Sequence, residues 1–397
     1  MGDKKYVADK FPKRQEGKLN IYFHISENSG VGYYRGYLPA VALRESGLAN
    51  VLVSDFRFGE GNHVEPDESL IFQLANWADL IVVGRKDLPN FYAQWGGIRE
   101  FFNIPIVLDT DDDIYNVRPT NPGYSAYHPG SEHITWNKYA ATKIFDAMSV
   151  STQQLVDIYK KDNPKVFLLP NGLDMKEWNS HPKKQHDDNL IRISFIGSSA
   201  HGEGVSMIKK PILEIMQKYP KVKFLITHVY RHFFDDYPED IKARMEFIPW
   251  IALKDWPKEV KNLGINIGLA PLTDNLFNRS KSNLRWMEYA ASNMAAIVSP
   301  VKPYLCVKDS VTGIFAQEKE EWFDAMERLI TNKELMYNIS KAAYEEVSTK
   351  YDIAKNISLW EKTYREIHDK FHQFFGAKRE FVKLNRKGKY KEIKSLS

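Results

Sequence analysis

Short apolar runs and helical patterns alternate along this chain in two separate sets. The first set begins with the apolar run Leu19–Ile25 and the second with the apolar run Ile191–Ile196. A strand, a helix and a second strand in succession form a βαβ unit, which builds a parallel sheet covered by helices. The alternation therefore predicts an α/β fold class with two domains, each built on a parallel sheet.

The expected domain boundaries follow from one polar stretch and from the last apolar pattern. Residues 178–189 are polar and carry no apolar periodicity, which is typical of a linker. Apolar residues then recur at helical spacing near the C-terminus. We divide the chain into a charged leader (1–18), a first domain (19–178), a linker (179–190), a second domain (191–345), a long helix that returns to the first domain (346–375) and a basic tail (376–397).

The net charge of +4 is concentrated in this tail. From Gly376 onward there are eight basic residues against Glu380 and Glu392, so the tail carries +6 and the rest of the chain −2. A basic segment of this kind is expected either to remain solvated or to contact nucleic acid or an anionic membrane surface.

The remaining composition bears on the cellular compartment. No apolar run reaches the ~20 residues that a membrane-spanning helix needs, and the leader lacks the apolar core of a signal peptide. Cys306 is the single cysteine, which excludes an internal disulfide and a cysteine-based zinc site. These features predict a cytoplasmic protein, and they leave its oligomeric state open.

A glycine turn follows the first expected strand. Gly30 and Gly32 lie where that strand gives way to a helix, so backbone amides there could face an anion. The third glycine, Gly36, comes one position too late for the dinucleotide fingerprint. The turn therefore favours an anion site or a tight turn over a dehydrogenase.

An acidic run follows the expected strand Ile104–Leu108. Asp109 is followed by Asp111, Asp112 and Asp113, and carboxylates so close together repel one another unless a cation or donors compensate. The run could bind a divalent metal, as in a phosphatase or a metal-dependent transferase. It could also accept hydrogen bonds from sugar hydroxyls and act as a base, or cap a helix in solvent.

The second domain offers two places for an anion. Gly197 and Ser198 follow its first strand in a loop of small residues that leads into a helix, and no P-loop lysine accompanies them. Arg279 and Lys281 precede a further helix, where formal charge and helix dipole would act together. Glu288 lies seven residues after Lys281, hence on the same face of that helix.

Three segments in this order resemble the GT-B glycosyltransferases, especially the large retaining group classed as family 4. They are Leu169–Asp174, which is similar to that group's "PNG-x-D" segment, Ile267–Leu272, and the stretch from Lys281-Ser282 to Glu288–Ala291. The resemblance implies two Rossmann-like domains that face a central cleft. It also implies transfer of a hexose or pentose from a nucleoside-diphosphate sugar, a UDP-sugar above all, with retention and without metal or other cofactor.

The resemblance also implies roles for single residues. Glu288 would hold the ribose, and the diphosphate would lie against the glycine turns and the cations, namely Gly30, Gly32, Gly197, Ser198, Arg279 and Lys281. Arg35 and Asp111 to Asp113 would position the acceptor hydroxyl. The group's first glutamate is replaced by Ser280, and its paired Arg and Lys after the first strand of the second domain have no clear counterpart.

Several interpretations follow from these departures. The acceptor could be a glycan, a glycolipid or other lipid-linked sugar, or a hydroxylated base in DNA. A non-catalytic protein that binds a nucleotide sugar or nucleic acid is one alternative, and a metal-dependent enzyme built on the acidic run is another.

Overall fold

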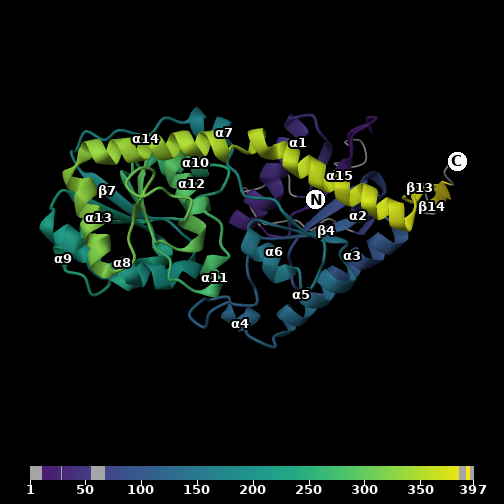
Figure 1. Cartoon of the computed structure of the whole chain (residues 1–397), viewed down its shortest axis with the longest axis horizontal. Coiled ribbons are helices and arrows are strands. Elements are labelled where there is room, and N and C mark those ends of the chain that lie inside the picture. Colours follow the sequence, from purple (N-terminus) through teal and green to yellow (C-terminus); the bar gives the residue numbers. More distant parts are fainter. Residues whose placement is uncertain (1–10, 28, 55–67, 384–389, 394–397) are drawn as a thin grey trace, which may run out of the picture. The chain divides into compact units, whose positions relative to one another are not determined.

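The computed structural model describes residues 11–27, 29–54, 68–383 and 390–393 (Figure 1). The chain folds into two compact units that are not simply consecutive in sequence. Unit 1 comprises Met1–Asp111, Gly130–Pro170 and Ile353–Ser397, and unit 2 comprises Asp112–Pro129 and Asn171–Asp352. The segment 112–129 thus leaves the strand before it and groups with the second unit.

Unit 1 is built on a parallel six-stranded sheet in the order β2-β1-β3-β4-β5-β6. Its central strands are continuous buried runs, as expected where helices cover both faces of a sheet. The strands are β1 (Asn20–His24), β2 (Asn50–Val53), β3 (Leu80–Gly84), β4 (Ile106–Thr110), β5 (Ala147–Val150) and β6 (Val166–Leu168). The helices are η1 (Gly32–Tyr37), α1 (Leu38–Glu45), α2 (Glu68–Trp77), α3 (Pro89–Phe102), α5 (Glu132–Lys143), α6 (Gln153–Tyr159) and α15 (Ile353–Phe375).

Unit 2 has a second parallel sheet of six strands in the order β12-β11-β10-β7-β8-β9. These are β7 (Ile191–Phe195), β8 (Val222–Thr227), β9 (Met245–Ile248), β10 (Ile267–Ala270), β11 (Ala295–Val298) and β12 (Ile314–Phe315). The longer helices are α8 (Gly202–Lys218), α10 (Trp256–Asn262), α12 (Leu284–Ala291), α13 (Lys319–Thr331) and α14 (Lys333–Lys350). The short ones are α4 (Tyr124–Tyr127), α7 (Met175–Ser180), η2 (Ser199–His201), η3 (His228–Phe234), α9 (Glu239–Lys242), α11 (Leu276–Arg279) and η4 (Lys302–Tyr304). Two parallel sheets with helices confirm the predicted α/β fold class.

Two local differences from the sequence expectations have physical reasons. Strand β4 runs two residues beyond the apolar stretch, so Asp109 and Thr110 are buried strand residues. The expected linker begins inside a helix, because Asp174 caps α7 by accepting a hydrogen bond from the Glu177 amide at 3.1 Å. Trp178 of α7 is only 2% exposed.

Helix α15 is part of unit 1, where it packs against α1. Its buried side chains recur every three or four residues and form one apolar face: Ile353, Ile357, Trp360, Tyr364, Ile367 and Phe371. The Tyr364 ring lies 5.9 Å from the ring of Phe23 in β1. Beyond α15, the strands β13 (Glu380–Lys383) and β14 (Tyr390–Ile393) pair antiparallel. None of the helices in the described part of the chain is long and apolar enough to cross a membrane.

Glycine at position 268 leaves room for a buried tyrosine. A Cβ on Gly268 of β10 would lie 2.5 Å from the ring of Tyr289 in α12. The Tyr289 hydroxyl donates to the Leu269 carbonyl at 2.9 Å, and it accepts a bond from the Ile196 amide at 3.3 Å. The ring is therefore held between β7 and β10, and the strand can approach α12 only where it carries no side chain.

We expect Gly268→Ala to lower the free energy of unfolding by about 1–3 kcal/mol, because the added methyl overpacks this contact. Chemical denaturation measures the change. Gly97→Ala is the matched control: Gly97 lies in the interior of α3 with nothing near its Cβ. That replacement should raise the stability by up to about 1 kcal/mol through helix propensity. Equal effects of both variants would contradict the packing explanation.

Candidate functional site

The loop after β7 is held in place by one side chain at the end of β8 and one in η3. The Gly197 amide donates to Thr227 Oγ1 at 3.0 Å, and the Tyr230 hydroxyl accepts from the His201 amide at 3.1 Å while donating to the Ser198 carbonyl. The loop lies at the carboxyl end of a parallel strand, where open α/β sheets bind ligands. Ser198 is exposed there.

Arg285 of α12 lies directly against this loop. A Cβ on Gly197 would be 2.8 Å from both terminal guanidinium nitrogens of Arg285, so only glycine lets the loop and the cation approach this closely. The guanidinium carbon is 5.0 Å from the centre of the Phe195 ring, and Nη2 is 3.2 Å from His201 Nε2. The loop and α12 therefore bring a guanidinium group, a backbone turn and an imidazole together.

Lys281 adds a second positive charge to this group. Its Nζ lies 4.5 Å from the centre of the Phe277 ring. In the described ranges, neither Lys281 nor Arg285 has a carboxylate oxygen within ion-pair distance. Burial, followed by the charges of Arg285 and Lys281, holds the pKa of His201 well below its usual value. His201 is therefore neutral.

Glu288 lies one helical turn after Arg285. The Trp256 indole, at the start of α10, donates to Glu288 Oε1 at 2.8 Å. This bond fixes the carboxylate on the same face of α12 as Arg285. Lys281 lies before α12, in the short connection between α11 and α12.

Arg279 differs from the other predicted cations because it already has a carboxylate partner. Its Nε and Nη2 donate to the two oxygens of Asp274 at 2.6 and 2.7 Å. The pair is about half exposed, and the neighbouring Arg279 charge lowers the pKa of Asp274 through that hydrogen bond. Much of the charge that we expected to face a diphosphate is offset by Asp274.

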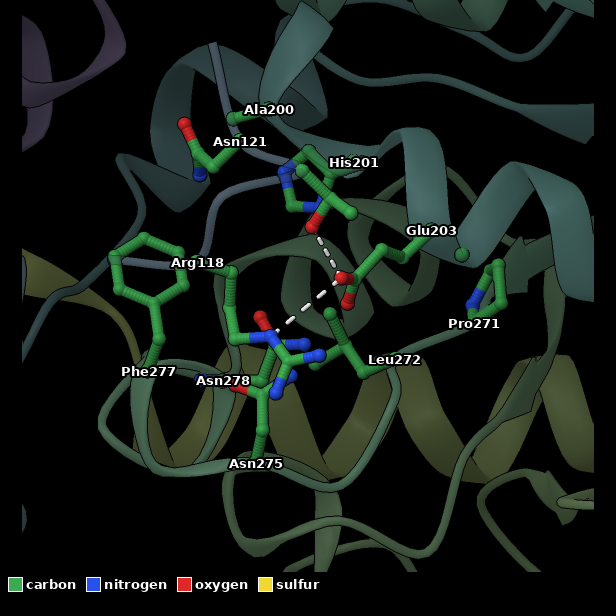
Figure 2. Close-up of a pocket in the computed structure, with 12 residues that line it drawn as sticks. Arg118, Asn121, Ala200, His201, Glu203, Pro271, Leu272, Asn275, Phe277 and Asn278 are labelled. Carbon is green, nitrogen blue, oxygen red and sulfur yellow. Dashed lines mark hydrogen bonds and ion pairs between the residues drawn. The ribbon is translucent and has the colours of Figure 1, made fainter. Parts of the chain in front are cut away.

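A polar hollow adjoins the two cations within unit 2 (Figure 2). It holds about 350 Å³, open solvent at its mouth included, and His201 and Phe277 line it as well as belonging to the cation group. Other lining residues offer guanidinium, hydroxyl, amide and carboxylate groups: Arg118, Thr120, Asn121, Glu203, Asn275 and Asn278.

Glu203 is the acidic group of this hollow. Its carboxylate accepts a hydrogen bond from the Thr120 hydroxyl, and Arg118 Nε lies 3.7 Å away (Figure 2). The Thr273 hydroxyl donates to the same carboxylate at 2.7 Å. Burial raises the pKa of Glu203, but the two hydroxyl donors and Arg118 outweigh burial and leave the pKa below its usual value. The hollow thus contains an ionised carboxylate next to one guanidinium group and several neutral donors and acceptors.

In unit 1, Arg35 is buried and committed to Asp109. The guanidinium Nε and Nη2 donate to the two Asp109 oxygens at 3.0 and 2.8 Å, and Nη1 donates to the Leu169 carbonyl. Ser149 Oγ donates to Asp109 at 2.6 Å, and the Trp360 ring centre lies 5.0 Å from the guanidinium. Burial lowers the pKa of Arg35, but Asp109 more than compensates and the net shift is upward. Arg35 therefore joins η1, β4, α15 and Leu169, which directly follows β6, whereas we expected it to contact the acceptor.

The other acids of the run 109–113 differ from Asp109 in burial and in hydrogen-bond partners. Asp113 is fully buried and accepts bonds from the Tyr115 amide at 3.1 Å and from Asn116 Nδ2 at 2.7 Å. Burial is the main cause of its raised pKa. Asp111 and Asp112 are half-buried. Across the residues that the structure describes, no three His, Cys, Asp or Glu side chains are grouped to hold a metal ion.

The two glycines of the first turn differ from each other. A Cβ on Gly32 would lie 2.1 Å from the Glu27 carbonyl oxygen, whereas nothing lies within 4 Å of that position on Gly30. Gly32 lines a second hollow at the carboxyl ends of β1, β3 and β4, together with Ser26, Gly84 and Arg85. Arg35 and Asp109 also line this hollow, which lies within unit 1.

Known structures share this architecture at low sequence identity. HepE from Anabaena in complex with UDP-glucose matches 90% of this chain and 100% of its own, with a TM-score of 0.60 and 13% identity. The match to sucrose-phosphate synthase from Thermosynechococcus elongatus covers 89% of this chain and 100% of the synthase chain, with a TM-score of 0.61 and 14% identity. A third match is a Listeria monocytogenes protein provisionally named a UDP-N-acetylglucosamine 2-epimerase. The match covers 92% of this chain and 100% of the Listeria chain, with a TM-score of 0.52 and 14% identity.

The chain has the GT-B fold. No protein-family profile and no curated protein sequence matches it. At these identities the likeness concerns the arrangement of strands and helices, and the activity has to be argued from the site.

Sequence reasoning missed Arg285 and Glu203, and it did not identify the partner of Asp109. Arg285 could have been found, because it lies three residues before Glu288 and therefore on the same face of the expected helix. No sequence pattern indicated Glu203 as a site residue, because its partners Thr120 and Thr273 lie in loops that are distant from it in the sequence. Asp109 was noticed only as one acid of a run, and its partner Arg35 is 74 residues away.

We expect Asp109→Asn to destabilise the protein by about 3–5 kcal/mol, because it leaves a buried guanidinium without its counter-charge. Urea denaturation of the full chain, followed by tryptophan fluorescence, measures this decrease in the free energy of unfolding. Asp274→Asn is the control: it breaks an ion pair of similar geometry that is half exposed, so its cost should be about 0–1 kcal/mol. An equally small effect at Asp109 would show that burial does not make this pair important.

Proposed function

We propose that this chain is a glycosyltransferase that moves a sugar from a nucleoside-diphosphate sugar to an acceptor hydroxyl. The observation that carries the proposal is the pair of cations, Lys281 and Arg285, beside the Gly197–Ser198 turn, with no carboxylate oxygen of the described residues within ion-pair distance of either. Placed cations and backbone donors in this arrangement suit a diphosphate. HepE, which has the same fold, binds UDP-glucose, and this supports a UDP-sugar as the donor.

The proposed donor lies along α12. Glu288, held by Trp256, accepts hydrogen bonds from the ribose hydroxyls. Arg285, one turn earlier, and Lys281, before the helix begins, contact the diphosphate. When the sugar–phosphate bond breaks, negative charge grows on the leaving diphosphate. Fixed cations then stabilise the transition state more than the ground state.

The sugar itself occupies the polar hollow in this proposal. His201 and Phe277 belong both to the cation group and to the hollow, so a group attached beyond the diphosphate has a direct continuation there. The Glu203 carboxylate accepts from sugar hydroxyls, and the amides of Asn275 and Asn278 offer further donors and acceptors. An ionised carboxylate in this place favours neutral or amino sugars over acidic ones.

The proposal also covers the acceptor, the stereochemistry of transfer and the cellular location of the protein. We infer retention and metal independence from the resemblance to family 4. We assign the acceptor to unit 1, whose hollow is lined by the ends of three parallel strands. A glycan, a lipid-linked sugar and a hydroxylated DNA base all supply the required hydroxyl, and a cytoplasmic location suits each of them.

UDP binding by single variants tests the donor site. We expect Lys281→Ala and Arg285→Ala each to raise the Kd for UDP by about 10- to 100-fold, since each removes a charged partner of the diphosphate. Isothermal titration calorimetry measures the affinity. Arg279→Ala is the control, because Arg279 is paired with Asp274, and it should leave the Kd within about twofold. A large loss of UDP affinity in Arg279→Ala, with no loss in Arg285→Ala, would overturn the assignment of the diphosphate to Arg285.

Turnover on a panel of UDP-sugars tests the reaction and the role of Glu203. We expect mass spectrometry to detect released UDP, with glycosylated product when a suitable acceptor is supplied. Glu203→Gln should leave UDP affinity unchanged while it lowers the preference for neutral over acidic sugars by about tenfold. Tight binding without turnover on any acceptor would favour a non-catalytic binding protein, and loss of activity in a chelator would favour a metal-dependent enzyme.

A further inference from the structure

His201, at the end of η2, joins two neighbouring parts of unit 2, the cation group and the polar hollow. Its Nε2 lies 3.2 Å from Nη2 of Arg285, and its side chain lines the hollow together with Phe277. In the proposed function the diphosphate lies on the cations and the sugar fills the hollow. His201 is therefore placed where these two parts of the donor are joined.

The contact with Arg285 fixes the position of the imidazole proton. A guanidinium group has only N–H donors, so Nε2 of His201 must be the acceptor in this contact. A neutral imidazole has one acceptor nitrogen and one donor nitrogen, and the proton is therefore on Nδ1. Among the residues that the structure describes, no group is hydrogen-bonded to Nδ1. His201 thus has an N–H donor available for a ligand.

Two further contacts hold the imidazole in this position. The His201 amide donates to the Tyr230 hydroxyl at 3.1 Å, which fixes the backbone that carries the ring. The centre of the Phe195 ring lies 6.2 Å from the centre of the imidazole and 5.0 Å from the guanidinium carbon of Arg285. The imidazole and the guanidinium therefore pack on the same aromatic ring, so the donor is positioned before a ligand binds.

We propose that His201 donates a hydrogen bond from Nδ1 to the oxygen that joins the sugar to the diphosphate. This assignment rests on the proposed function, which places the diphosphate on Lys281 and Arg285 and the sugar in the hollow. During transfer the bond between this oxygen and the sugar carbon breaks, and both electrons stay on the oxygen. The acceptor oxygen bonds to the same carbon, and its proton passes to the departing diphosphate. His201 keeps its own proton and stabilises the negative charge that grows beside it.

A histidine that stays neutral suits this role. Burial and, after it, the charges of the two cations hold the pKa of His201 well below its usual value. Tyr230 has a raised pKa and is protonated, and the hollow adds the ion pair of Glu203 and Arg118. His201 is therefore an N–H donor of unchanging charge between about pH 6 and 8.

Nitrogen-15 NMR of the full chain with labelled histidine tests the tautomer without any substrate. We expect the His201 signals, identified by their loss in His201→Gln, to show a bare Nε2 and a protonated Nδ1 between about pH 6 and 8. Arg285→Ala should raise the pKa of His201, since a neighbouring positive charge is removed. A proton on Nε2 in the unchanged chain would overturn the assignment.

The same spectra test the contact with the ligand. UDP-glucose should shift the Nδ1 signal, because this ligand contains the oxygen between sugar and diphosphate. UMP, which lacks both the sugar and the second phosphate, should leave the signal where it is. No shift with UDP-glucose, or an equal shift with UMP, would contradict the proposed hydrogen bond.

Release of UDP from UDP-glucose separates a contact to the leaving oxygen from a structural role. We expect His201→Leu to lower kcat by about 10- to 100-fold, because it removes a donor to the growing charge, while KM changes by less than about threefold. His201→Gln should retain most of the rate, since its amide can accept from Arg285 and donate to the oxygen. His228→Leu is the matched control, because His228 is exposed in η3 of the same unit, and its kcat should match that of the unchanged chain.

The outcomes distinguish this inference from the proposed function. Unchanged UDP affinity in both Lys281→Ala and Arg285→Ala would refute the proposed donor site, and the role of His201 with it. Loss of UDP affinity in those variants together with full kcat in His201→Leu would refute only the role of His201. An equal loss of rate in His201→Leu and His201→Gln would also refute it, and thermal unfolding followed by circular dichroism verifies that each variant is folded.

Discussion

A buried guanidinium and a buried carboxylate, Arg35 and Asp109, determine how the parts of unit 1 fit together. Removing two charges from water is costly unless they meet in good geometry and their remaining donors and acceptors are satisfied. Here Ser149 supplies one further donor and the Leu169 carbonyl one further acceptor. The π-helical turn, the ends of β4 and β6, and α15 must therefore all be in place before the pair is stable.

In unit 2, by contrast, two neighbouring cations lack a carboxylate at ion-pair distance among the described residues. Its glycine loop keeps Arg285 close to backbone amides, a neutral imidazole and Lys281, with no carboxylate at ion-pair distance in the described chain. Neighbouring like charges destabilise a folded protein. An anionic ligand would relieve that repulsion, so the same arrangement that costs stability in the free protein favours binding. The exposed Arg279–Asp274 pair, a few residues away, has no such unbalanced charge.

The sequence allowed the sheets to be predicted because buried parallel strands are continuous apolar runs that local reading detects. It also predicted a helix that carries Glu288, but α12 begins at Leu284, so Lys281 does not share a helical face with Glu288. Contacts between distant residues could not be read in this way: Arg35 and Leu169 are 134 positions apart. The partner of Arg279 is nearby, but charge alone does not reveal which cations are already paired. Much of the basic tail, including Arg386, Lys387, Lys389 and Lys394, lies outside the described residues, as does most of the leader.

The membership of α15 in unit 1 has a consequence for biosynthesis. All of unit 2 lies before residue 353, whereas unit 1 needs the first strands and also Trp360 over the Arg35 guanidinium. A ribosome releases the chain from the N-terminus, and domains generally fold as units during synthesis. The unit that is begun first is therefore completed last. Until α15 emerges, the apolar surface that it will cover on the early strands remains open to chaperones.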